Sequence, residues 1–235
     1  DYAVAENGLS PGPRERFVPL WPQPGILARK SSRGTTVRCL AYQGRTQSVP
    51  RWFADRDFHE ALARGGFSFD VRRRAWHDYR DVDVTIAGRE SAPLGLSAKP
   101  GTKVYNAWHA GTPVLAVPEP AYLELRRDPL DFLSVRGPGA VLQALDRLVR
   151  DPSLYRSMVE NGRRRAAEFS VEAIRARWLE LVDREFLPAF LRARPAPLRN
   201  AWFIGAMAWQ HVASRVWKLR TDRIPHGPAA GAASA

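Results

Sequence analysis

The sequence predicts an α/β fold built on a doubly wound parallel sheet. Short segments with strand character alternate along the chain with longer segments whose apolar residues recur at helical spacing. Four of the short segments suit strands: 35–42, 67–71, 82–87 and 113–117. Buried parallel strands read as near-continuous apolar runs, and 113–117 is the clearest case. Strands and helices that alternate in this way are typical of a parallel sheet with crossover helices.

Helices connect these strands in the first half of the chain. A helix is expected over 53–63, ended by Gly65-Gly66, and a short helical turn over 76–79. Another helix is expected between Thr102 and Gly111. The Thr102 hydroxyl can accept an N–H of the first turn, and a glycine can close the last turn in a left-handed conformation.

The second half continues the pattern. The expected elements are a helix at 119–126, a strand at 132–135, and helices at 139–150 and 151–169, the last with Asn161-Gly162 as a candidate break. Ser170 is placed to cap a long helix over 171–187. Pro188 should stop or kink that helix, because proline lacks the N–H and crowds the preceding turn.

Composition divides the chain into four parts. Residues 1–34 are rich in proline, glycine and arginine and are expected to form an interdomain linker, while 35–194 carry the sheet. Residues 195–224 form an aromatic, basic, amphipathic helix, which suits either a membrane interface or a return to another domain. Residues 225–235 are low-complexity Ala/Gly and are expected to be disordered.

The net charge of the chain indicates which kinds of partner it can bind. The net charge is +12, with 36 Lys and Arg residues, which favours nucleotide phosphates, nucleic acid or an anionic membrane. Nucleic acid is not favoured, because no zinc-finger spacing or RNA-binding motif is present. No apolar run is long enough to cross a membrane and no signal peptide is recognisable. A cytoplasmic protein is expected, with peripheral contact through 198–220 at the inner membrane face left open.

The most informative segment is the one from Lys99 to Pro118, KPGTKVYNAWHAGTPVLAVP. It combines a bend, a short helix, a glycine turn and a buried strand. Lys103 falls in the first helical turn, where a cation is unfavourable against the helix dipole. A bound anion would offset that cost, since the free N–H groups of a helix N-terminus attract phosphate.

This segment resembles the nucleotide-sugar-binding half of GT-B glycosyltransferases, which have two Rossmann-like domains. Many retaining members carry Lys-Leu-x-Glu-Ala-x-Ala-x-Gly-x-Pro-Val at this point. Residues 103–114 of this chain, KVYNAWHAGTPV, keep the Lys, the first Ala, the Gly, the Pro and the Val of that motif at the same spacing. The resemblance implies a Rossmann-like C-terminal half, with an acceptor-binding N-terminal domain outside this sequence. The chain by itself is then expected to be inactive.

The resemblance also implies roles for individual residues. The diphosphate would be bound by cations and a hydroxyl near strand ends and the helix start: Arg45, Arg89, Lys99, Thr102 and Lys103. Asn106 and Tyr105 would contact the ribose and the base, and Glu119 and Glu124 the sugar. A departing diphosphate develops negative charge, which cations placed in advance stabilise best. No catalytic residue can be named.

The chain departs from the family pattern at two positions. The family has two glutamates that here fall at Ala98 and Asn106. Asn106 can still hydrogen-bond a ribose but carries no charge. The departure puts the donor, the mechanistic class and activity itself in doubt. No metal or other cofactor is expected, since Asp81-Val-Asp83 stands at the start of its strand and not at its carboxyl end.

The sequence therefore predicts a hexosyltransferase, or its donor-binding half, that uses a nucleotide-sugar and a glycan, lipid or other acceptor. Two alternatives from other classes stay open. One is a non-catalytic nucleotide-sugar-binding or interaction module, which the missing glutamates favour. The other is a nucleotide-sugar epimerase on the same scaffold, which would need acid and base carboxylates facing the sugar.

Overall fold

The computed structural model describes residues 3–5, 8, 14–89, 99–192 and 209. The chain forms two units, Asp1–Phe186 and Leu187–Ala235. Of the second unit, the structure describes α8 (Leu187–Arg192) and residue 209. The expected helix over 195–224 and the tail over 225–235 lie outside the described residues, apart from that single position.

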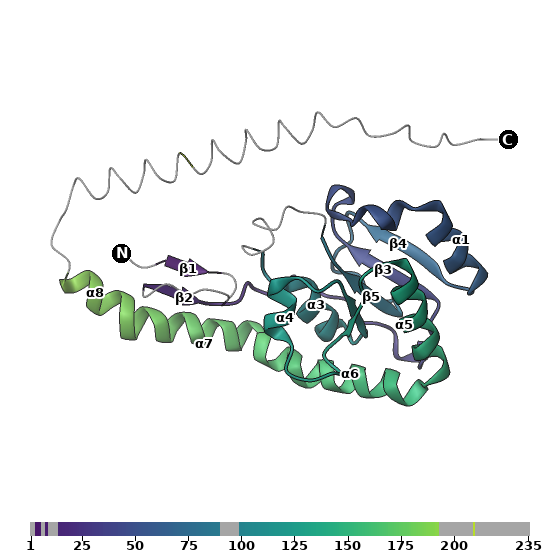
Figure 1. Cartoon of the computed structure of the whole chain (residues 1–235). Helices are drawn as coiled ribbons and strands as arrows, with labels where there is room; N and C mark the ends of the chain where they lie inside the picture. Colours follow the sequence, from purple (N-terminus) through teal and green to yellow (C-terminus); the bar gives the residue numbers. More distant parts are fainter. Residues whose placement is uncertain (1–2, 6–7, 9–13, 90–98, 193–208, 210–235) are drawn as a thin grey trace. The chain divides into compact units, whose positions relative to one another are not determined.

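A five-stranded parallel sheet forms the centre of the first unit. Its strands are β3 (Cys39–Gln43), β4 (Ser68–Arg72), β5 (Val84–Ala87), β6 (Val114–Ala116) and β7 (Leu133–Ser134). They lie in the order β4-β3-β5-β6-β7, and every pair is parallel. Each expected strand is present. This is the α/β fold that the alternating sequence pattern predicts, and Figure 1 shows β3, β4 and β5 of the sheet with helices around them.

The described α-helices of the first unit connect successive strands or follow the last strand, β7. They are α1 (Arg56–Arg64), α3 (Thr102–Ala110), α4 (Pro120–Leu125), α5 (Pro138–Arg150), α6 (Pro152–Ala166) and α7 (Val171–Leu181). Gly65 and Gly66 end α1, Gly111 ends α3 with a φ of 73°, and the Ser170 hydroxyl accepts the Ala173 N–H at the start of α7. These stop and start signals were predicted and are confirmed.

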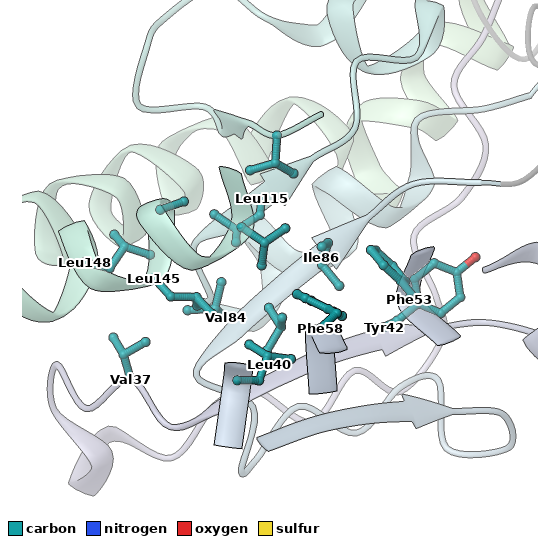
Figure 2. Packing of buried hydrophobic residues seen from close by; sticks show 14 of the residues in the cluster. Val37, Leu40, Tyr42, Phe53, Phe58, Val84, Ile86, Leu115, Leu145 and Leu148 are labelled. Carbon is teal, nitrogen blue, oxygen red and sulfur yellow. The ribbon is translucent and has the colours of Figure 1, made fainter. Parts of the chain in front are cut away.

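Alternate residues of each strand face opposite sides of the sheet. Leu40 and Tyr42 of β3 pack on one face with Ile86 of β5 and Leu145 of α5, a cluster that also includes Phe53 and Phe58 (Figure 2). Ala41 and Ala87 face the other side, among residues of α3 and α4. Both faces are therefore covered by apolar side chains, which explains why these strands read as continuous apolar runs.

Four local expectations are wrong. Residues 76–79 form a turn and a single bridge to Leu27, not a helical turn. Gly101, not Thr102, is the N-cap of α3, and no side chain caps that helix. The Val104 N–H is already taken by the Gly101 carbonyl at 3.0 Å, which leaves the Thr102 hydroxyl without the role of cap.

Asn161-Gly162 does not break α6, which runs unbroken across both residues. The Asn161 side chain donates to Asp131 at 2.8 Å, so it is used in packing and does not compete with the helix backbone. Gly162 lets α3 approach closely, since a Cβ there would stand 2.9 Å from Trp108 Cδ1. Pro188 does not end the helical run either: a π-helical turn (Val182–Phe186) precedes it, and it lies in the first turn of α8, where a missing N–H costs little.

The N-terminal segment contacts the sheet unit at several points. β1 (Ala3–Ala5) and β2 (Glu15–Phe17) form a separate parallel pair. Val18, which follows β2, is buried with Ile174 and Leu181 of α7. Further along, the Arg29 N–H donates to the last carbonyl of α3, Ala110, at 2.9 Å. The assignment of 1–34 as an interdomain linker stays a prediction.

A buried carboxylate at the start of β5 ties this segment to the sheet. Asp83 is fully buried and accepts hydrogen bonds from the guanidinium groups of Arg29 and Arg33 and from the N–H groups of Arg38 and Cys39. Burial by itself raises the pKa of Asp83, but these donors outweigh it, so the pKa lies below its ordinary value. Asp83 is thus a structural group at the amino end of the sheet.

The first prediction concerns the contact between α3 and α6. Gly162→Ala should destabilise the fold by about 1–3 kcal/mol, because the added methyl would crowd the Trp108 ring. Gly139→Ala in α5 is the matched control: a Cβ there meets nothing within 4 Å, and alanine should be neutral or stabilising. Urea unfolding of both variants measures the difference, and equal effects would contradict the packing argument.

The second prediction concerns Asp83. Asp83→Asn should destabilise the fold by about 3–5 kcal/mol, since it leaves two guanidinium groups without their buried counter-charge. Because the folded pKa lies below the unfolded one, this stabilisation is present above the unfolded pKa and is lost as the pH falls through the folded pKa. Unfolding measured between pH 3 and pH 7 should show this loss in the natural chain and not in the variant. The exposed Asp70→Asn is the control.

Candidate functional site

The order of the strands defines a switch point in the sheet. From β3 the chain crosses in one direction to β4 and later in the other direction from β5 to β6. The crossovers therefore diverge next to the β3–β5 pair, and in open α/β sheets ligands bind outside the carboxyl ends of the strands at such a point. Gln43 ends β3, and Gly88-Arg89 follows β5.

Lys103 reaches into this switch point from the first turn of α3. Its ammonium group donates to the Gln43 carbonyl and lies 4.3 Å from the centre of the Tyr42 ring. Gly44 allows this approach, because a Cβ there would stand 2.7 Å from Lys103 Nζ. Both of these partners are uncharged, so within the described residues Lys103 is a largely buried cation with no carboxylate bound to it.

Arg89 brings a second cation to the same place. Its guanidinium group pairs with Glu119 at 2.5 Å, donates to the Pro100 carbonyl at 2.6 Å, and lies 5.1 Å from the centre of the Tyr122 ring. The Arg89 side chain is 10% exposed and the Glu119 side chain 1%. The loops after β5 and β6 thus hold an ion pair beside Lys103. We call Tyr42, Gln43, Arg89, Lys103, Glu119 and Tyr122 the switch-point cluster.

Burial shifts the protonation of this cluster. Desolvation, aided by the nearby charge of Arg89, lowers the pKa of Lys103 to about 7, although Glu119 opposes the change. Desolvation also raises the pKa of Glu119, and the Arg89 charge offsets only part of that rise. Perturbed groups of this kind are concentrated at functional sites, where a ligand supplies the missing counter-charge.

Several polar atoms of the cluster have no hydrogen-bond partner in the described part of the chain. They are both amide atoms of Gln43, the second carboxylate oxygen of Glu119 and the Tyr122 hydroxyl. Buried polar atoms are nearly always hydrogen-bonded in folded proteins, so a group of unpaired atoms in one cluster calls for a bound molecule or water.

The structure brings together three of the residues that the sequence singled out: Arg89, Lys103 and Glu119. Arg45 follows Gly44 at the end of β3 but is exposed, and no contact joins its side chain to the cluster. Lys99 is also exposed. It lies directly after residues 90–98, which are outside the described part of the chain. Thr102 is the first residue of α3, half-buried beside Lys103.

The residues expected to bind ribose and base contact the backbone of the N-terminal segment. The Asn106 side chain accepts the Gln23 N–H at 3.0 Å, and the Tyr105 hydroxyl donates to the Leu20 carbonyl at 2.9 Å. The Tyr105 ring is buried and stacks on Phe169 with a centroid distance of 4.7 Å. Both side chains of α3 therefore have structural partners.

Glu124 is likewise engaged away from the cluster. Its carboxylate accepts the Gly8 N–H at 2.7 Å, and burial raises the pKa of Glu124 while that hydrogen bond offsets part of the rise. Of the two glutamates expected near the sugar, Glu119 alone belongs to the cluster.

Sequence reasoning missed the roles of Tyr42, Gln43 and Tyr122. Gln43 carries the one signal that was available, a polar residue at the end of an otherwise apolar strand. The two tyrosines have none, because an aromatic residue in a buried strand or helix is more often part of the core.

Other features of the described residues add no second chemistry. They contain no group of acidic, histidine or cysteine side chains suited to a metal ion, and none of their helices is long and apolar enough to cross a membrane. The Asp81-Val-Asp83 pair lies at the amino end of β5. His109 contacts the Phe169 carbonyl at 3.1 Å and is a packing histidine.

Comparison in sequence gives no relative: no protein-family model matches this chain, and no curated protein matches it. Comparison of structures finds proteins with a similar fold. HepE from Anabaena, solved in complex with UDP, superposes with a TM-score of 0.59 at 12% identity, covering 77% of this chain and 63% of HepE. Sucrose-phosphate synthase from Thermosynechococcus elongatus gives a TM-score of 0.50 at 18% identity, covering 75% of this chain and 54% of that enzyme.

These similarities confirm the fold class. The parallel α/β sheet matches that of GT-B glycosyltransferase structures, as the motif around Lys103 suggested. This chain spans less than two thirds of the length of either neighbour. At such low identity the likeness shows the fold alone, so which half of a GT-B protein this is, and what it does, are matters for proposal.

The third prediction concerns the buried Lys103 charge. The folded pKa of about 7 lies below the value of 10.5 for a free lysine, so the folded state binds fewer protons between these values and stability rises with pH. The unliganded chain should gain about 1–3 kcal/mol between pH 7 and pH 9. Lys103→Met should remove that gain and stabilise the chain at pH 7, whereas Lys30→Met, at an exposed site, should change neither. Urea unfolding at both pH values measures this, and a gain retained in Lys103→Met would contradict it.

Proposed function

We propose that the switch-point cluster binds the diphosphate of a nucleotide-sugar, and that the protein transfers the hexosyl group to a glycan, lipid or other acceptor as a glycosyltransferase. The observation that carries the proposal is the Lys103 charge, which no described carboxylate pairs with, beside Arg89 at the β3–β5 switch point. HepE, whose fold this chain shares, was solved with UDP, which supports a nucleotide diphosphate as the ligand class.

The charges of the cluster suit this ligand. Arg89 is already paired with Glu119, so the free charge is that of Lys103, at the start of a helix whose first N–H groups have no partner within the helix. A diphosphate can use the ammonium group, the helix N-terminus and the partly exposed edge of Arg89 together. Arg45 and Lys99 in neighbouring loops and Thr102 at the start of α3 are proposed as outer contacts.

The same cations would assist transfer. As the bond from the anomeric carbon to the diphosphate oxygen breaks, the leaving group gains negative charge, and prearranged cations lower the energy of that state. The acceptor hydroxyl oxygen forms the new bond to the anomeric carbon, and its proton passes to an oxygen of the departing diphosphate. The unpaired oxygen of Glu119 and the Tyr122 hydroxyl lie beside Arg89 and are proposed to contact sugar hydroxyls. No described residue is assigned as the catalytic base.

One observation favours a second candidate, a binding module without catalysis. Asn106 occupies the place of a family glutamate, and its side-chain oxygen is taken by the Gln23 N–H. The ribose would then lack its charged partner. Measurement of turnover with an acceptor, alongside nucleotide binding, separates the two candidates: a module binds the nucleotide and leaves the sugar-nucleotide intact.

The fourth prediction tests the binding site. Calorimetric titration with UDP, GDP, ADP and CMP should show selective binding of one nucleotide. Lys103→Met should weaken that binding by about 10- to 100-fold, the effect of losing a hydrogen bond to a charged group. Arg147→Ala, which removes an exposed cation of α5, is the control for general charge attraction. Equal weak binding of all four nucleotides, or equal losses in the two variants, would reject the site.

The pH dependence of that binding has a definite sign. A diphosphate binds protonated Lys103, and the fraction protonated in the free chain falls above pH 7. Affinity should therefore drop about tenfold between pH 7.5 and pH 9, a range in which the phosphate groups themselves are fully ionised. Lys103→Met should bind weakly at both pH values with no such slope. A slope that persists in the variant would assign the titration to another group.

A further inference from the structure

A concave region lies at the amino ends of the strands, at the opposite end of the sheet from the switch-point cluster. It is an open cavity of about 600 Å³, lined by residues 29–31, 34 and 35, by Gly111 and by residues of α6. None of the switch-point residues lines it. A volume of this size is in the range of small-molecule pockets. The cavity therefore has room for a ligand of its own.

Its wall contains a buried cation. The Arg29 side chain is 6% exposed and is held by Asp83 at 2.8 Å and by the Gly34 and Thr36 carbonyls at 2.8 and 3.0 Å. Its guanidinium carbon lies 5.3 Å from the centre of the Tyr155 ring, and Tyr155 also lines the cavity. Asp83 is shared between Arg29 and Arg33, so one carboxylate faces two cations.

The rim adds cations that the described part of the chain leaves without a counter-charge. Lys30, Arg156 and Arg163 line the cavity, and none of them forms an ion pair with any described carboxylate. Glu160 is the single acidic residue of the lining. It stands four residues after Arg156 and three before Arg163 on α6, a spacing that permits ion pairs, yet neither pair forms.

Structural roles account for only part of this charge. α3 ends at the cavity, where a Cβ on Gly111 would stand 3.6 Å from the Arg163 guanidinium. The C-terminus of a helix is equivalent to about half a negative charge. The lining holds four cations and one carboxylate, so a surplus of positive charge remains after the helix dipole is counted.

We infer that this cavity is a second ligand site, for a multiply charged, phosphate-bearing molecule. Several converging cations favour a di- or polyphosphate over a single carboxylate, since each charge-assisted hydrogen bond needs its own oxygen. The Ser31 and Thr35 residues of the lining carry hydroxyl groups that can donate to further phosphate oxygens. The site is separate from the proposed donor site, because the two occupy opposite ends of the same strands.

The fifth prediction tests this site with inorganic pyrophosphate. Titrations use Lys103→Met as the background, so that the switch-point cluster does not contribute. Arg163→Ala in that background should weaken pyrophosphate binding at least tenfold, and Lys30→Ala should act in the same direction. Arg164→Ala is the matched control: it removes the same charge from the next residue of α6, which is also exposed and does not line the cavity. It should change affinity by less than twofold.

A second arm separates a soluble ligand from a lipid headgroup. Cosedimentation with phosphatidylcholine vesicles that contain phosphatidylglycerol should depend on Arg163 and not on Arg164 if the phosphate belongs to a lipid. Pyrophosphate binding with the same dependence, and no vesicle binding, assigns a soluble ligand. Equal losses in Arg163→Ala and Arg164→Ala in both arms would overturn the site in favour of general charge attraction. Absence of binding in both arms would overturn it as well.

Discussion

The parallel pairing of β3 with both β4 and β5 is the constraint on which the rest of the structure depends. Two parallel neighbours on opposite sides force the crossovers to leave in opposite directions, and this opens the carboxyl end of the β3–β5 pair. The first turn of α3 then lies over the end of β3, close enough for Lys103 to reach the Gln43 carbonyl. At the amino ends of the same strands, Asp83 before β5 accepts the N–H groups of Arg38 and Cys39 at the start of β3. The β3–β5 pair therefore positions residues at both ends of the sheet.

The charged groups buried at the two ends of β5 have different kinds of partner. Asp83 at the start has two guanidinium groups and two backbone N–H groups around it, so its charge is satisfied within the protein. Lys103, near the other end, has a carbonyl and an aromatic ring in place of a carboxylate. The first arrangement stabilises the fold, whereas the second costs stability. Proteins retain such a cost where function needs it, and this is the reason for proposing a ligand beside Lys103.

The helix that carries Lys103 serves two partners at once. Lys103 points to the strand ends, while Tyr105 and Asn106 bind the backbone of residues 20 and 23. A match to a family motif fixes the spacing of these residues along the helix, but their partners lie more than 80 positions away in the chain. The motif therefore placed Lys103 well and left the surroundings of Asn106 open. The N-terminal segment, which the composition marks as a linker, uses groups that the resemblance assigns to a nucleotide.

The sequence by itself determined the α/β class, the order of the elements and the glycine and serine signals that begin and end the helices, because these follow from local periodicity and backbone preference. It also placed Arg89, Lys103 and Glu119 at strand ends. The tertiary structure alone decided which of the candidates meet. It joined those three to Tyr42, Gln43 and Tyr122, directed Glu124 to Gly8, and left Arg45 on the surface. The physical reason is that desolvation and pairing of a side chain depend on neighbours distant in sequence, which no local pattern contains.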